Sequence, residues 1–135
     1  MDSKFAADFA SEWIAAWNAH DLPRVLSHYT EDFEMTSPKI VQIAGEPSGR
    51  LVGKAAVGAY WETALARVPD LHFTLLAVMH GIDSVVLHYR GVGGQLVAEV
   101  FYFNSSGLVI RACANYQSTL PISPNKLTPS AVYTE

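Results

Sequence analysis

Residues 71–118 read "LHFTLLAVMHGIDSVVLHYRGVGGQLVAEVFYFNSSGLVIRACANYQS", and this stretch decides the fold class. Runs rich in Val, Leu, Phe and Tyr, which are enriched in β-strands, are broken at Gly81, residues 91–94 and residues 104–107. The pattern predicts four strands, over about residues 71–79, 82–91, 95–103 and 108–118. Because their connections are short, an antiparallel meander is the simplest pairing.

The chain before this stretch is predicted to be mainly helical. Apolar residues recur every three to four positions, which predicts amphipathic helices over about residues 4–19, 23–29 and 54–68. Asp21 is a capping residue for the second helix, and Pro23 fits its first turn.

A short strand and a loop are predicted between the second and third helices. The sequence "FEMTSP" (residues 33–38) alternates apolar and polar residues, and its proline limits how far the strand can pair. The glycines and Pro47 of "GEPSGRLVG" (residues 45–53) indicate irregular chain, interpreted as a mobile rim. Helices followed by a sheet predict one α+β domain over residues 1–120, with a proline-containing tail at 121–135.

The composition limits the classes of molecule that the protein is expected to bind. There are 9 Lys and Arg against 13 Asp and Glu, so the formal charge is −4, and neither sign forms a run. We therefore expect no binding to nucleic acid or to anionic membranes. A single cysteine, no signal segment and no span-length apolar stretch predict a soluble, cytoplasmic protein. Since half the residues are hydrophobic, we expect apolar surface to meet a ligand or a second chain.

Three segments resemble the NTF2-like superfamily in its bacterial, SnoaL-like branch, which is related to the ketosteroid isomerases: "EWIAAWNAHDLPRVLSHYTEDFEMTSP", "GRLVGKAAVGAYW" and "FYFNSSGLVIRACANY". The resemblance covers about residues 4–118. It implies a cone-shaped barrel, in which a strongly curved antiparallel sheet wraps a long N-terminal helix accompanied by two further helices. It also implies a deep apolar pocket and a homodimer formed through the outer face of the sheet.

The resemblance assigns family positions to four residues. Ketosteroid isomerases use an Asp base and an oxyanion hole made of a Tyr and a protonated Asp. Ser37 corresponds to the base, and a neutral hydroxyl cannot accept a proton from carbon unless it is activated. Trp13 corresponds to the oxyanion Tyr and Trp61 to a supporting Tyr. Glu99 corresponds to the protonated Asp, in the region that supplies the acid/base Asp of SnoaL-type cyclases.

Glu99 is also the residue that most requires explanation from the sequence alone, as the only acid between Ser84 and Leu120. Its strand is apolar on both faces, so alternation leaves open whether it faces a pocket or pairs on the outer face with Arg90 or Arg111. The aligned position favours the pocket. There, desolvation would raise its pKa and suit it to acid/base work near neutrality.

The remaining candidates are aromatic, histidine and turn residues. Trp13, Trp17 and Tyr60 stand at helical spacing and are either core or pocket lining. The resemblance places Tyr29 and Tyr116 at aromatic pocket positions, and the alternative is that they are half-buried core residues. The predicted ligand-binding set is Trp13, Trp17, Tyr29, Ser37, Tyr60, Trp61, His88, Phe101 and Tyr116. His28 and His88 are interpreted as possible proton shuttles near Glu99. The five histidines show no metal-ligand spacing, so no metal and no cofactor is predicted.

These observations predict a pocket for a small, mostly apolar organic ligand. One interpretation is a cofactor-independent isomerase, cyclase or hydratase with Glu99 as the acid/base and tyrosines that position the substrate. The alternative is a module that binds a ligand or a protein without catalysis, which the missing base and oxyanion Tyr favour.

Overall fold

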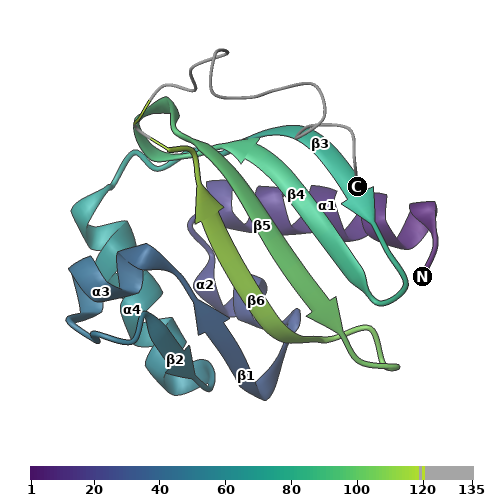
Figure 1. Ribbon diagram of the computed structural model, residues 1–135, viewed down its shortest axis with the longest axis horizontal. Coiled ribbons are helices and arrows are strands. Elements are labelled where there is room, and N and C mark those ends of the chain that lie inside the picture. The colour runs from purple at the N-terminus through teal and green to yellow at the C-terminus, as the bar shows by residue number, and fades with distance from the viewer. Residues whose placement is uncertain (119, 121–135) are drawn as a thin grey trace, which may run out of the picture.

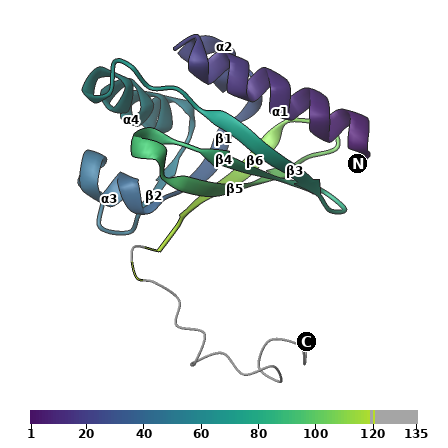
Figure 2. The ribbon, with the colours of Figure 1, turned by 90° about the horizontal axis from the view of Figure 1, so that it is seen from above.

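The computed structural model describes residues 1–118 and residue 120, so the predicted tail lies outside the described part of the chain. Along the chain, the elements are α1 (Ser3–Asn18), α2 (Leu22–Leu26), β1 (Tyr29–Thr36), α3 (Pro38–Ala44), β2 (Arg50–Val52), α4 (Lys54–Arg67), β3 (Thr74–His80), β4 (Ser84–Arg90), the 3-10 turn η1 (Val92–Gly94), β5 (Leu96–Phe103) and β6 (Val109–Tyr116) (Figure 1). Helices α1, α2 and α4 lie on one side of a curved sheet (Figure 2). The predicted α+β class and the sheet that curves around a long N-terminal helix are confirmed.

Helix α1 forms where its spacing predicts it and is fixed at both ends. Asp2 caps its start by accepting a hydrogen bond from the Phe5 backbone N–H. At its other end, the Asn18 side chain both donates to and accepts from the backbone of Phe73, just before β3. The buried stripe of α1 packs toward the sheet and consists of Ala6, Phe9, Ala10, Trp13, Ala16 and Trp17.

The six strands are ordered β2-β1-β6-β5-β4-β3. Strands β3 to β6 form the predicted antiparallel meander. The expectation of a wholly antiparallel sheet is wrong, because β1 pairs with β6 in parallel. A parallel pair needs a long crossover, and the chain between these two strands supplies one. The sheet is not closed into a barrel, since β2 and β3 remain its edges.

The loop predicted after the first strand is wrong, because it contains α3 and β2. Ser37 caps α3 by accepting a hydrogen bond from the Lys39 backbone N–H, and Pro38 occupies its first turn. Gly45 ends the helix with a left-handed φ of 70°. Within the described residues, three further α-helices therefore accompany α1 instead of two.

The boundary after the second helix also differs from the prediction. Helix α2 ends at Leu26, and Tyr29 begins β1 instead of ending the helix. The side chain of Tyr29 is buried against Phe33 and Trp61, with ring centroids 4.3 and 5.4 Å away. The first residue of β1 is therefore part of the aromatic core.

Candidate functional site

Strands β4, β5 and β6 place three rows of side chains on the inner face of the sheet. Side chains alternate between the faces of a strand, so the register of the pairs defines each row. The rows are Tyr89, Val97 and Tyr116, then Leu87, Glu99 and Ala114, then Val85, Phe101 and Ala112. Glu99 therefore occupies the middle row, and its side chain faces α1.

A pocket of about 220 Å³ lies against this inner face. Its walls are mostly aromatic and aliphatic and include Trp13 and Trp17 of α1, Tyr60 and Trp61 of α4, and Phe73. The lining residues that are exposed, Arg67 at the end of α4 and Val92 after β4, mark its mouth. Glu99 lines the interior with only 4% of its surface exposed.

The Glu99 carboxyl has one hydrogen-bond donor within residues 1–118. The Tyr89 hydroxyl donates to Oε1 over 2.7 Å. Burial raises the pKa of Glu99 to about 7, because desolvation outweighs the hydrogen bond from Tyr89, which favours the ionised form. The acidic and ionised forms are therefore both populated near neutral pH.

The alternative that Glu99 lies on the outer face of the sheet and pairs with Arg90 or Arg111 is excluded, because both arginines have other partners and Glu99 is buried. The Arg90 guanidinium donates to the carbonyl of Gly94, and Arg111 stacks 4.1 Å from the ring centroid of Tyr102. Neither pairs with Glu99, whose strand buries alternate residues from Val97 to Phe103.

Tyrosines surround the acid. Burial raises the pKa of Tyr29, Tyr60, Tyr89 and Tyr116, and the nearby Glu99 carboxylate raises each one further. For Tyr60 the pKa reaches about 12. These phenols hold their protons throughout the range in which Glu99 titrates, so they are donors and not bases.

Trp13 and Ser37 both form hydrogen bonds that stabilise the fold. The Trp13 indole N–H, at the position aligned with the oxyanion Tyr, donates to the Tyr29 hydroxyl over 2.9 Å in a buried hydrogen bond. Ser37 caps α3, and its Oγ lies 3.5 Å from the Tyr116 hydroxyl.

The structure brings most of the residues singled out from the sequence together and separates others. The pocket lining includes Glu99, Trp13, Trp17, Tyr60, Trp61 and Tyr116. Three residues are buried but do not line the pocket, namely Tyr29, Ser37 and Phe101. Phe101 packs instead against Phe9 and Trp13, with ring centroids 4.9 and 5.2 Å away.

The placement of the histidines is a correction. His88 pairs in register with Ala98 and therefore faces the outer side of the sheet, whereas its neighbours Leu87 and Tyr89 face inward. His28 lies 3.6 Å from the carboxylate of Glu12 and stacks edge-on with Phe9. Neither His88 nor His28 lines the pocket, so the proton-shuttle interpretation is wrong.

Sequence reasoning missed Tyr89, Lys39, Arg67 and Phe73, which all line the pocket. Tyr89 could have been predicted, because side chains alternate between the two faces of a strand. In the predicted strand of residues 82–91, Tyr89 therefore shares the face of Leu87. Lys39 was hidden by the loop prediction, although the Ser-Pro pair before it and Gly45 after it form a helix start and stop signal.

Residues 10–117 match the SnoaL-like domain family. The chain belongs to the SnoaL-like family. A SnoaL-like protein of unknown function from Burkholderia thailandensis E264 is 57% identical to it, and the alignment covers 87% of this chain and 98% of that one with a TM-score of 0.84.

More distant SnoaL-like and related structures share the fold alone. A candidate isomerase of the SnoaL-like family from Agrobacterium tumefaciens strain C58 is 16% identical, with a TM-score of 0.68 over 85% of this chain and 99% of that one. AclR, a candidate hydroxylase from Streptomyces galilaeus, is 19% identical, with a TM-score of 0.65 over 86% and 91%. No curated protein matches this SnoaL-like sequence.

The described part of this SnoaL-like chain has neither a metal-ligand cluster nor a membrane-spanning helix. There, no three His, Cys, Asp or Glu side chains are grouped so that they could hold a metal ion. None of the helices within the described residues combines the length and the apolar character needed to cross a membrane.

Proposed function

We propose that the pocket binds a small, mostly apolar organic molecule and that Glu99 exchanges a proton with it. The observation that supports this most directly is the buried pair of Glu99 and Tyr89 on a mostly apolar wall. A general acid or base is most effective when its pKa lies near the working pH, and the pKa of Glu99 is about 7. No cofactor is needed for such a step.

The geometry limits the kind of proton transfer. Among the described residues, Glu99 is the only carboxyl that lines the pocket, so in this proposal the same group takes a proton from the ligand and returns it. Ionised Glu99 would remove a proton from a carbon next to a carbonyl, and the protonated carboxyl would then deliver it to another atom on the same face. Tyr60 and Tyr116 line the same cavity, and we assign their protonated hydroxyl groups as donors to the ligand oxygen.

A second candidate function is ligand binding without catalysis. The observation that favours it is that Trp13 and Ser37, aligned with the catalytic positions of ketosteroid isomerases, are both occupied in structural hydrogen bonds. The Trp17 indole N–H also lines the pocket region as a buried donor without a partner in residues 1–118. A ligand acceptor would satisfy it without any chemistry.

Deuterium exchange separates the two functions. A panel of small cyclic ketones is screened for binding by calorimetry, and the ligands that bind are incubated with the protein in D2O. If Glu99 transfers protons, NMR shows faster deuterium incorporation next to the carbonyl, and Glu99→Gln keeps binding but loses the acceleration. Binding without acceleration in the wild type supports the binding module, and a failure to bind any of the ketones contradicts both.

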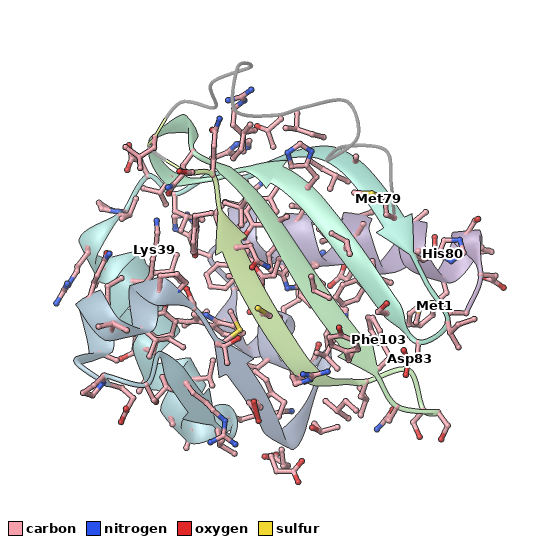
Figure 3. All side chains as sticks on the ribbon, in the orientation of Figure 1. Met1, Lys39, Met79, His80, Asp83 and Phe103 are labelled. Carbon is pink, nitrogen blue, oxygen red and sulfur yellow. The ribbon has the colours of Figure 1, made fainter. Side chains whose placement is uncertain are left out.

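We also propose a homodimer formed through the outer face of the sheet. Register aligns Met79, Val86, Val100 and Cys113 in one row across four strands on that face, with Met79 labelled in Figure 3. Met79 is 51% exposed, and the other three are partly exposed. An apolar row of this length on a solvent-facing sheet is typical of an interaction surface.

A further inference from the structure

The charged residues of the pocket are distributed unevenly. Of the residues that the structure describes, two cations, Lys39 and Arg67, and one acid, Glu99, belong to the lining. Within the described residues, the salt bridges of Lys4, Arg24 and Arg50 join them to carboxylates, whereas Lys39 and Arg67 form none. The two cations of the lining therefore have no carboxylate partner among the described residues.

Lys39 is held against the pocket rather than free in solvent. Its Nζ lies 4.7 Å from the ring centroid of Tyr116, the last residue of β6, and Figure 3 shows the side chain rising from α3 beside that strand. Burial lowers the pKa of Lys39, which means that its ammonium is partly desolvated without a counter-ion. A bound anion would offset that desolvation.

The cations and the acid lie at different depths. Tyr116, which contacts Lys39, belongs to the first row of the sheet, and Glu99 lies in the next row. Two residues along a strand span about 7 Å, so this is the distance between the rows. Arg67 is exposed at the mouth, and Glu99 is buried. The pocket thus has a cationic mouth, an aromatic wall and an acid in its interior.

We propose that the ligand is an apolar organic acid whose anionic group binds Lys39 and Arg67 at the mouth. Its apolar body lies along Trp17, Trp61 and Phe73, and a carbonyl or hydroxyl group at its far end reaches Glu99. The inference rests on the proposed function, since it names the class of molecule that the same pocket takes. It also assigns Lys39 and Arg67 as specificity-determining residues, which no part of the acid/base step requires.

Matched ligands test the inference. Calorimetry compares a series of phenyl-alkanoates, beginning with 4-phenylbutanoate, with their primary amides, which have the same body without the charge. In the wild type we expect each carboxylate to bind about tenfold more tightly than its amide, in the range of a charge-assisted hydrogen bond. Added salt should weaken the carboxylates and leave the amides unchanged.

Variants assign the preference to the two cations. Lys39→Gln combined with Arg67→Gln should remove the preference for the carboxylate while amide binding persists. Lys4→Gln is the matched control, because it removes one positive charge from an exposed pair with Asp8 on α1. It should leave the preference intact. Unchanged melting temperatures verify that each variant is folded.

Each outcome has a distinct meaning. Equal binding of carboxylates and amides by the wild type overturns the anionic subsite but leaves the apolar pocket as a binding site. A preference that survives loss of both cations also overturns it. Failure of both ligand series to bind contradicts the proposed function itself.

Discussion

The hydroxyl of Tyr89 lies 2.7 Å from Oε1 of Glu99, and both side chains are buried on the inner face of the sheet. The two residues are diagonal neighbours, because Tyr89 pairs in register with Val97, two residues before the acid on β5. This single donor opposes the desolvation of the carboxyl. The balance between this hydrogen bond and burial determines whether the Glu99 carboxyl is protonated.

Replacement of Tyr89 by Phe should raise the pKa of Glu99 above about 7. The hydrogen bond favours the ionised carboxylate, so its loss leaves desolvation unopposed. Stability should fall by roughly 1 kcal/mol for the lost buried hydrogen bond. Infrared or carbon NMR titration of the carboxyl measures the pKa, with Tyr102→Phe on the outer face as the control. An unchanged or lower pKa would contradict the assigned role of the Tyr89 hydroxyl.

The stability of the protein should depend on the protonation of Glu99. Its folded pKa, about 7, is raised above the ordinary value of 4.5, so the folded state binds more protons between these values. The contribution of Glu99 is fully present below pH 4.5 and is lost as the pH rises to about 7. The whole shift corresponds to roughly 3 kcal/mol.

Glu99→Gln isolates this contribution, because the amide does not titrate and the other groups are unchanged. Urea unfolding at pH 5 and pH 8 should show that the wild type loses more stability than the variant as the pH rises. His28, whose pKa is lowered by burial, titrates in both proteins and cancels in the difference. Parallel pH profiles would show that Glu99 is not desolvated in the folded state.

The fold followed from the sequence where one periodicity was unambiguous. The apolar stripe of α1 is typical only of a helix. The glycines between β3, β4, β5 and β6 mark the ends of these strands. Helix α3 could not be predicted in this way, because a helix of seven residues packs few apolar side chains against the core, here Ile40 and Ile43. The parallel pairing of β1 with β6 depends on a crossover that no local pattern encodes.

The direction of Glu99 could not be predicted from alternation for a physical reason. The outer face of β5 is also apolar, with Val100 in the row of Met79 and Val86, so both faces of the strand have the same pattern. Tyr89 becomes the partner of Glu99 only through the register of β4 against β5. That register depends on the turn at residues 91–95, which a sequence pattern does not fix.

Ser37→Ala should destabilise the protein by about 1 kcal/mol, the usual value of a lost helix cap. The Ser37 hydroxyl accepts the hydrogen bond from the Lys39 backbone N–H, and this contact begins α3. Ser37→Thr should keep most of the stability because threonine also caps. Thermal unfolding measures both variants. If Ser37→Ala abolishes any deuterium exchange of a bound ketone without lowering stability, the residue acts in catalysis and the structural assignment is wrong.

The proposed homodimer predicts a particle of twice the 14.7 kDa chain mass in light scattering coupled to size exclusion. Val100→Asp should convert it to a folded monomer, because it places a charge within the apolar row on the outer face. Ile82→Asp is the control, since Ile82 is 92% exposed in the turn between β3 and β4 and belongs to neither strand. A monomeric wild type, or a dimer that Val100→Asp leaves intact, would show that this face is not the interface. Because Val100 faces away from Glu99, ligand binding by the Val100→Asp monomer would further show that one chain alone forms the complete pocket.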